Sequence, residues 1–558
     1  MGIQVLMALA GGLGLFLYGM KLMNEGLEKA AGARLRRILE LVTKNRFLGM
    51  LVGILFTAVI QSSSATTVLV VSFVNAGLMD LMQAAGVILG ANIGTTVTAQ
   101  LIAFNLSDVA PLFLIGGVVM VMFFKQPMIK RIGEVILGFG MLFFGMSIMS
   151  DGMEILKESP MITDILGSLT HPLLAVGVGF IVTAILQSSS VTVGIILLMA
   201  SQGLISLGIC FYIILGCNMG SCVPALIASI GGKKMAKRAA HIHFIVNIIG
   251  SAAIMIVLCF LHDQILQMIT GISSAMGIED VYVNGMNAKI ARDVANTHLI
   301  FKVFQVLICF PLIKPLVKLT YLIVPGDDKK TDNMHLEYIS ENSVFSTTAA
   351  VPSIISETTR MAGIAIDNLS KGVDVLFTKN SSVIEEIYTT EKSVNFLNEQ
   401  ITNYLVKANQ LSLPVEDRKL LGGLFHVVND IERIGDHAEN MADAATQLIE
   451  DNLSISKDGE EQIRDMFAKT KTLLRYSLEA FEKKNEEHLR DILLLEDEID
   501  ELERVLQESH IGRLTRGECD AETGMIFTDV VSNLERVADH ATNIAFSIIS
   551  NSAQKQEI

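Results

Sequence analysis

The stretch FLGMLVGILFTAVIQSSSATTVLVVSFVNAGLM, residues 47–79, sets the fold, because two apolar runs flank a polar centre and no ionisable side chain interrupts them. An apolar stretch of this length is typical of a membrane protein. Consecutive polar residues facing lipid would remain unpaired, at a cost of several kcal/mol for each group. The stretch therefore predicts a helical hairpin that enters and leaves a bilayer on one side, with its tip buried in protein. The tip consists of Gln61, Ser62, Ser63 and Ser64, followed by Thr66.

The same pattern recurs 126 residues later in the chain. A second QSSS lies at 187–190, and GANIGTT at 90–96 corresponds to GCNMGSC at 216–222. GLGLFLYGMKLMNEGLE at 12–28 likewise corresponds to GFGMLFFGMSIMSDGME at 138–154. Three matches in one register without a gap indicate an internal duplication.

Basic residues predict that the two copies face opposite sides of the membrane, since Lys and Arg near spanning segments favour the cytoplasm. Seven of them lie in 21–46 and only one in the equivalent 147–172, whereas 231–240 has four and the equivalent 105–114 has none. Inverted copies require an odd number of crossings in each.

Seven crossings satisfy this requirement, and they place the N-terminus outside and residue 325 in the cytoplasm. Residues 34–44 are predicted as a basic amphipathic helix on the inner surface, the alternative being an extension of the first crossing. The second hairpin falls at 173–205. The crossings are predicted near 3–23, 82–104, 110–125, 133–150, 206–230, 241–261 and 297–325.

Charge separates this membrane part from the rest of the chain: residues 1–325 carry a net charge of +6 and residues 326–558 a net charge of −21. An acidic domain of this kind disfavours binding to nucleic-acid phosphates. The fold class is predicted as all-α. The predicted organisation is transmembrane repeat 1 at 1–126, inverted repeat 2 at 127–262, an external loop at 263–296, a final transmembrane helix at 297–325, a linker at 326–344 and a helical domain at 345–558.

Polar motifs at matching positions of inverted repeats predict a transport site at their interface. Glycines at 90, 94, 216 and 220 are expected to break the crossings beside the hairpins, although small residues also serve close helix packing. The candidate substrate- and ion-binding residues are Gln61, Ser62, Ser63, Ser64, Thr66, Asn92, Thr95, Thr96, Gln187, Ser188, Ser189, Ser190, Thr192, Asn218 and Ser221.

The segments that carry these motifs, 47–79, 81–107 and 173–232, contain no Lys, Arg, Asp, Glu or His. This composition disfavours a proton relay. A buried anion would be held by helix N-termini, hydroxyl groups and mobile cations instead of fixed positive charge. The reasoning favours an anion moved together with Na+, and it does not identify the anion.

The doubled QSSS, each copy followed by G-x-N-x-G, resembles the type II sodium/phosphate cotransporter family in its bacterial form with a PhoU-like cytoplasmic domain. The resemblance covers nearly the whole chain. It implies alternating-access symport of inorganic phosphate with Na+ across the cytoplasmic membrane, and it leaves uptake or export open. One departure is Cys222, which stands where the first copy has Thr96.

In the acidic domain, apolar spacing predicts six helices near 345–378, 382–410, 416–451, 457–484, 486–510 and 518–552. ERIGDHAEN at 432–440 recurs as ERVADHATN at 535–543, which predicts two three-helix bundles. Carboxylates four residues apart share a helix face, so Glu432 with Asp436, and Glu535 with Asp539, are candidate metal ligands. The alternative is a solvated surface stripe. Resemblance to PhoU implies iron or zinc at these positions, or a docked cytoplasmic regulator.

Other function classes remain open at this point. The chain is either the carrier described above, a membrane-anchored metal-binding regulator without transport, or a carrier of another oxyanion such as sulfate or arsenate. A homodimer is one of the assemblies that the sequence allows. No P-loop, G-x-S-x-G or H-E-x-x-H motif is present, so no enzyme activity is expected.

Overall fold

The computed structural model is almost entirely α-helical and divides into two compact units, Met1–Asp328 and Lys329–Ile558. Each unit is described by itself. The structure describes residues 2–42, 45–75, 78–156, 171–230, 232–278, 280–283, 286–326, 333–339, 350–411, 413, 415–483, 486–517 and 519–547.

The first unit consists of apolar helices arranged in a repeated order. Its elements are α1 (Gly2–Val42), α2 (Arg46–Ile60), α3 (Ser63–Asn75), α4 (Leu81–Gly94), α5 (Thr96–Ile102), the 3-10 turn η1 (Ser107–Val109), α6 (Ala110–Phe123), α7 (Pro127–Leu156), α9 (Pro172–Leu186), α10 (Ser189–Ser201), α11 (Leu207–Gly220), α12 (Val223–Ala228), α13 (Lys234–Ala275), β1 (Tyr282–Val283), β2 (Met286–Asn287), α14 (Ala288–Cys309) and α15 (Ile313–Ile323).

The helices keep the register of the sequence repeat. The bounds of α9, α10 and α11 each lie 126 positions after those of α2, α3 and α4. Local caps repeat as well: Asp80 caps α4 through a capping box, and Ser206, at the equivalent position, caps α11. The duplicated sequence therefore specifies the same succession of helices twice.

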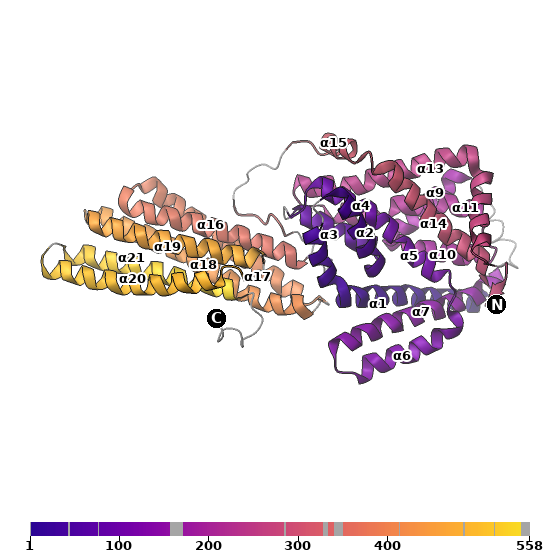
Figure 1. Ribbon diagram of the computed structural model, residues 1–558, viewed down its shortest axis with the longest axis horizontal. Coiled ribbons are helices and arrows are strands. Elements are labelled where there is room, and N and C mark those ends of the chain that lie inside the picture. Colours follow the sequence, from indigo (N-terminus) through magenta and orange to yellow (C-terminus); the bar gives the residue numbers. More distant parts are fainter. Residues whose placement is uncertain are drawn as a thin grey trace. The chain divides into compact units, whose positions relative to one another are not determined.

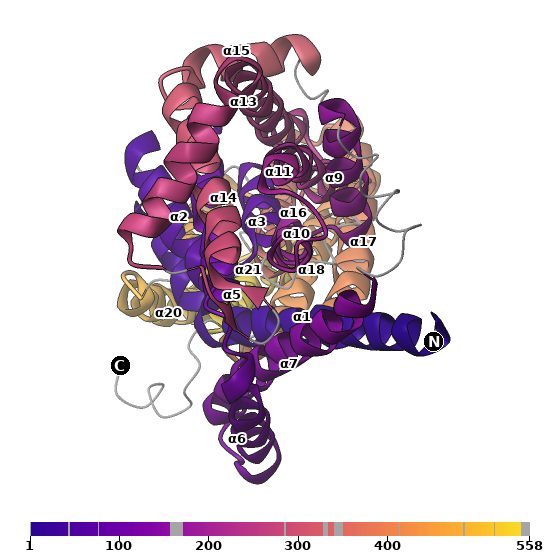
Figure 2. The same ribbon diagram turned by 90° about the vertical axis from the view of Figure 1, so that its right-hand side faces the viewer.

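Packing in this unit places each hairpin against the helix that follows it. α2 packs on α4, and α9 packs on α11. α1 and α7 run side by side, and α6 lies along α7 (Figures 1 and 2). Large apolar side chains on α6 and α9, such as Phe123 and Ile185, are exposed, as expected for surfaces that face lipid.

The lengths of the helices support most of the predicted crossings. Among the described residues, five helices are long and apolar enough to cross a membrane: Val5–Ala31, Leu81–Ile102, Pro127–Ile155, Leu207–Ala228 and Lys234–Ala275. A sixth candidate is the pair α14 and α15, which is bent by 81°. The predicted crossing at 110–125 corresponds to α6, whose 14 residues are short for a span.

Three expectations are corrected by these helices. Residues 34–42 continue α1, so the alternative of an extended first helix holds for this stretch. Residues 263–296 form mostly helix instead of a loop, because α13 continues to Ala275 and α14 begins at Ala288. The final segment is not one straight helix, because it is interrupted at Pro311 between α14 and α15. Arg238 donates hydrogen bonds to the carbonyl groups of Val324 and Gly326, which holds the end of α15 against α13.

The second unit has the six helices predicted from apolar spacing, and no other helix is found among its described residues. α16, α17 and α18 pack together, as do α19, α20 and α21, and α18 joins the two groups by packing on α21 (Figure 1). Buried residues of all six helices form one apolar core. Their bounds are α16 (Ala350–Thr378), α17 (Ser381–Asn409), α18 (Val415–Glu450), α19 (Lys457–Lys483), α20 (Leu489–Thr515) and α21 (Ala521–Phe546).

Candidate functional site

The two QSSS motifs form the turns of two helical hairpins. Gln61 ends α2 with φ 61°, and Gln187 ends α9 with φ 55°. Both glutamines are thus in the left-handed region, which costs a residue with a side chain roughly 1–2 kcal/mol. The chain tolerates this strain twice, at equivalent positions, and such strain is typical of functional turns.

The first serine of each motif caps the outgoing helix. Ser62 Oγ accepts a hydrogen bond from the amide of Ala65 at 3.2 Å, and Ser188 Oγ accepts one from the amide of Val191 at 3.4 Å. The two preceding amides of each helix lie in its first turn, where no intrahelical acceptor is available. Each hairpin tip therefore presents backbone donors, together with its serine hydroxyl groups, to a ligand.

Paired threonines connect the two arms of each hairpin. The hydroxyl groups of Thr57 and Thr66 are 2.8 Å apart, and those of Thr183 and Thr192 are 3.0 Å apart. All four side chains are buried. Because the two pairs are related by the repeat, both tips have the same internal support.

The two tips lie next to each other. Ser64 Oγ donates to the backbone oxygen of Gln187 at 3.4 Å. Thr95, at the junction of α4 and α5, has its hydroxyl 3.1 Å from that of Ser190. The structure thus brings together residues from both QSSS motifs and one of the G-x-N-x-G motifs, although they are separated by about 90 to 125 positions in the chain.

The pair of tips is not fully symmetric. Gln61 is 4% exposed, and its Oε1 accepts a hydrogen bond from Thr98 Oγ1 at 2.7 Å. Pro224 stands at the position equivalent to Thr98 and has no hydroxyl, and Gln187 is exposed. Ser63 and Ser189 are buried in both tips. The glutamine of the first motif is therefore fixed by a neighbour that the second motif lacks.

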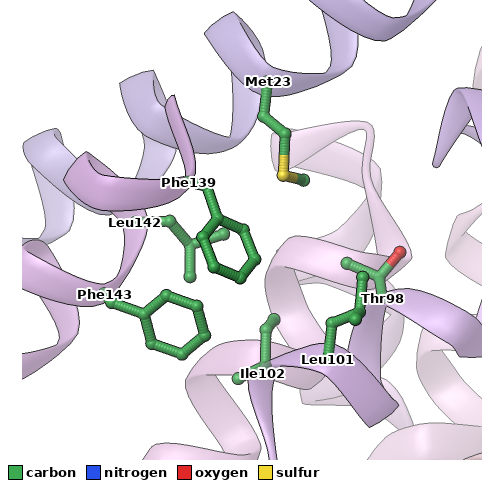
Figure 3. A pocket seen from close by; sticks show the side chains of 7 residues that line it. All are labelled: Met23, Thr98, Leu101, Ile102, Phe139, Leu142 and Phe143. Atoms are coloured by element: carbon green, nitrogen blue, oxygen red, sulfur yellow. The ribbon is translucent and has the colours of Figure 1, made fainter. Parts of the chain in front are cut away.

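Thr98 also lines a small apolar cavity of about 10 Å³. Figure 3 shows Phe139 and Phe143 facing Leu101 and Ile102 across it, with the hydroxyl oxygen of Thr98 directed away from the rings. A space of this size holds about one water molecule. It is too small and too apolar for an oxyanion, so we place the candidate site at the tips.

The glycines of the G-x-N-x-G motifs serve close packing. A Cβ atom on Gly90 would lie 2.0 Å from the carbonyl oxygen of Met50, and one on Gly216 would lie 2.0 Å from that of Val176. Neither glycine has a positive φ, and Thr95, where α4 ends, has helical angles. α4 ends at Gly94 and α11 ends at Gly220, so each crossing is interrupted at the last glycine of its motif, as expected. Gly90 and Gly216 instead let α4 and α11 approach α2 and α9.

The side-chain amides of the motif asparagines make no hydrogen bond to a serine of either QSSS motif among the described residues. Asn92 is 2% exposed, and its Oδ1 accepts a hydrogen bond from Lys302 Nζ at 2.7 Å. Asn218 is fully buried, and neither atom of its amide has a partner among the described residues. Thr96 and Ser221 donate at 2.7 Å to the carbonyl groups three residues earlier in the chain, those of Ile93 and Asn218.

Lys302, which lies on α14, is a residue that the sequence analysis missed. It is 1% exposed and also donates to Asn247 Oδ1 at 3.2 Å, while Gln305 Nε2 donates to the same oxygen at 2.6 Å. The expectation that the site region has no fixed positive charge is therefore corrected. The missed signal was an ionisable residue within a predicted crossing, which usually marks function. Among the described residues, Lys302 donates hydrogen bonds to Asn92 and Asn247 and to no residue of either QSSS motif.

In the second unit, three carboxylates converge between α20 and α21. Oxygens of Asp500, Glu535 and Asp539 lie within 4.8 Å of one another. Burial, followed by the charges of Asp539, Glu503 and Asp500, raises the pKa of Glu535 to about 7. Glu535 and Asp539 were predicted from the repeated motif, whereas Asp500 was not, because it comes from another helix.

The equivalent acidic group in the first bundle lies between α17 and α18. Burial and then the charge of Asp436 raise the pKa of Glu432. Glu391 is 2% exposed, and its carboxylate oxygens have no hydrogen-bond partner among the described residues. Burial, followed by the charges of Asp436, Glu439 and Glu432, raises the pKa of Glu391 to about 8. Both clusters concentrate negative charge that a bound cation would offset.

The histidines beside these motifs have other partners. His437 Nδ1 lies 2.6 Å from Asn533 Oδ1, and His540 Nδ1 lies 2.9 Å from Asp430 Oδ1. These contacts connect α18 with α21. A metal at either cluster would therefore have carboxylate ligands, a set that suits hard cations and occurs for iron in helical bundles, whereas zinc more often takes imidazole or thiolate.

Comparisons with known proteins agree with the two-unit division. The family model described as Na+/Pi-cotransporter matches residues 15–151 and again 144–279, and the PhoU domain model matches residues 358–445 and 463–548. Each model matches twice, in agreement with the two internal repeats of the chain.

Three curated relatives cover different parts of the chain. An uncharacterized protein of Bacillus subtilis, YqeW, is 32% identical over 315 residues, which are 56% of this chain and 95% of that protein. The putative inorganic phosphate export protein YjbB of Escherichia coli is 22% identical over 98% of this chain and 97% of its own. PhoU homolog 1 of Thermotoga maritima, a phosphate-specific transport system accessory protein, is 24% identical over 35% of this chain and 83% of its own.

Proposed function

Because the chain belongs to the Na+/Pi-cotransporter family and carries a PhoU domain, we propose that it moves inorganic phosphate across the cytoplasmic membrane, coupled to Na+, by alternating access. The single observation that carries the proposal is the meeting of the two hairpin tips, in which Ser64 contacts Gln187 and Thr95 contacts Ser190. Two helix N-termini and their hydroxyl groups then converge on one place, as an anion requires.

Sodium coupling is supported by the chemistry of the same residues. Hydroxyl, amide and backbone oxygens are the ligands that alkali cations take in transporters. Two tips with few fixed charges near them hold a multiply charged anion better when cations bind beside it. We propose that the fifteen motif residues provide both kinds of ligand, with the N-terminus outside and the PhoU-like domain in the cytoplasm.

Flux measurements on the purified full-length protein in liposomes test this proposal. We expect labelled phosphate to enter when a Na+ gradient is imposed and not when choline replaces Na+. Unlabelled phosphate should compete, and competition by sulfate or arsenate at lower concentration would reassign the substrate to another oxyanion. No flux of any oxyanion under either gradient would favour a membrane-anchored regulator over a carrier.

The direction of physiological flux is a separate question. The relative YjbB, which aligns over nearly the whole chain, carries the name of a putative phosphate exporter. A symporter follows the combined gradients of its substrates, so the same geometry serves uptake or export. Phosphate content of cells lacking and overproducing the chain decides: a lower content on overproduction would indicate export, and a higher one uptake.

For the PhoU-like domain we propose a regulatory role that depends on a bound cation. The support is the pair of acidic clusters, one in each bundle, with raised carboxylate pKa values. Elemental analysis of the purified protein should find a transition metal that decreases in the variant Asp500→Asn/Asp539→Asn. Asp529→Asn, an exposed change on the same helix, is the matched control. Equal metal content in all three proteins would exclude this site.

A further inference from the structure

The strongest unexplained feature of the first unit is the buried ammonium group of Lys302. It lies between α4, α13 and α14, with Nζ 2.7 Å from Asn92 Oδ1 and 3.2 Å from Asn247 Oδ1. Asn247 in turn donates from Nδ2 to Cys222 Sγ at 3.1 Å. Lys302 therefore contacts the asparagine of the first repeat directly and approaches the second repeat through Asn247.

Its hydrogen-bond acceptors are of the kind that bind an alkali cation. No ion pair to Lys302 is found among the described residues, and both oxygens to which it donates are neutral amide oxygens, with the thiols of Cys217 and Cys222 and the imidazoles of His243 and His298 also near it. Removing a cation from water is costly, so a buried lysine is usually paired with a carboxylate. A cation held by neutral oxygens alone is instead the arrangement in which transport proteins and channels bind Na+ or K+.

The repeat supplies an internal comparison. Asn218 stands 126 positions after Asn92 and is equally buried, but its Oδ1 accepts no hydrogen bond from the described residues. One amide oxygen of the related pair thus accepts a hydrogen bond from a cation of the protein itself, and the other has no partner among the described residues. A buried amide without partners is rare in proteins, and a bound ion or water would satisfy it.

We propose that the Lys302 ammonium is a tethered cation, which occupies at Asn92 the position that a sodium ion takes at Asn218. The inference rests on the proposed sodium-coupled function and refines it. Because Lys302 stays with the protein, one positive charge fewer crosses the membrane with each anion than in a carrier that binds sodium at both asparagines. The lysine also keeps the first position filled when sodium is scarce.

The test compares Lys302→Ala with the wild type in proteoliposomes. The substitution removes the charge and opens space at Asn92 Oδ1, so we expect a steeper dependence of phosphate flux on Na+ concentration and one more sodium ion, and one more charge, moved per phosphate. Lys302→Arg should keep the wild-type steepness. Lys318→Ala, an exposed lysine on α15, is the control for the loss of one positive charge.

Other outcomes of this experiment overturn the inference. If Lys302→Ala leaves the Na+ dependence of flux as steep as in the wild type but raises the KM for phosphate, Lys302 binds the anion. If the variant changes neither the Na+ dependence nor the KM, Lys302 is not part of the site. If the wild type shows no sodium-driven flux, the proposed function fails first, and this result is distinguishable from a failure confined to the variant.

A binding measurement keeps the inference testable when Lys302→Ala is inactive or unstable. Sodium, compared with choline, should raise the thermal midpoint of the detergent-purified wild type. We expect Asn218→Ala to lose this stabilisation and Asn92→Ala to retain it, since of the two asparagines Asn218 alone is proposed to bind a mobile ion. Equal losses in both variants would contradict a tethered cation at Asn92.

Discussion

Gln61 and Gln187 combine a strained backbone with a polar side chain at the centre of the site. Each is a non-glycine residue with positive φ at the end of an apolar helix. A residue selected only for its conformation would be glycine, which adopts this region at no steric cost. Glutamine at both positions therefore fits the proposal that the side-chain amide is a ligand.

Substitution of both glutamines by glycine separates these two contributions. In Gln61→Gly/Gln187→Gly we expect the turns to be relieved of roughly 1–2 kcal/mol each, while phosphate flux falls at least tenfold because the amide ligands are lost. Thermal unfolding and flux of the same preparation provide the two readouts. Asn452→Gly, which relieves a positive φ of 53° outside this unit, should leave flux unchanged. Full flux in the double variant would show that the glutamines are not ligands.

At the scale of elements, the glycines of α4 and α11 set the distance between each helix and its hairpin. A Cβ on Gly90 or Gly216 would meet a backbone oxygen at 2.0 Å, which neither side can avoid by a rotamer change. We expect Gly90→Ala and Gly216→Ala each to cost about 1–3 kcal/mol of stability by overpacking and to reduce flux. Thermal unfolding in detergent measures the loss.

The matched control for these variants is Gly116→Ala on α6. A Cβ there has open space around it, so the same chemical change should leave stability unchanged or slightly increased. If Gly116→Ala were as destabilising as Gly90→Ala, helix propensity or expression would explain the result, and the packing account of the motif glycines would be wrong.

The packing of α20 on α21 introduces a pH dependence into the second unit. His510 is 3% exposed, and burial, followed by the charge of Arg513, lowers its pKa. A depressed pKa means that the unfolded chain binds the proton more readily, so stability from this group is present above pH 6.5 and is lost as the pH falls below it. We expect hydrogen exchange of α20 and α21 in the full chain to accelerate at acidic pH, and less so in His510→Gln.

At the scale of the whole molecule, the two units are expected to have separable functions. The Bacillus subtilis relative is matched over 95% of its length by 315 residues of this chain, so a relative without the remaining residues exists. Deletion of residues 334–558 should therefore leave sodium-driven phosphate flux intact. The bound metal should be lost, and the flux should no longer change with phosphate supply. Flux, phosphate response and metal content that are all unchanged would contradict a regulatory role for the PhoU-like domain.

Much of the helical order could be predicted from sequence because it depends on local patterns. Apolar runs, caps and the 126-residue repeat specify α2 to α4 and α9 to α11. Apolar residues at intervals of three to four positions specify the six helices of the second unit. The bend between α14 and α15 lies at Pro311, a helix breaker that the single predicted crossing at 297–325 did not take into account, whereas the contact of Arg238 with the end of α15 joins residues more than 80 positions apart and could not be predicted. The helical nature of 263–296 was missed because that stretch is only moderately apolar.

The sequence by itself determined the duplicated motifs, the family and the chemistry of the tips, since each is encoded in contiguous residues. Only the tertiary structure decided that Ser64 meets Gln187, that Asp500 joins Glu535 and Asp539, and that Lys302 contacts Asn92. These contacts join residues from different helices, and the position of one helix against another depends on packing at the glycines and on long-range polar pairs. A linear pattern records which side chains are available, whereas the fold decides which charges become neighbours.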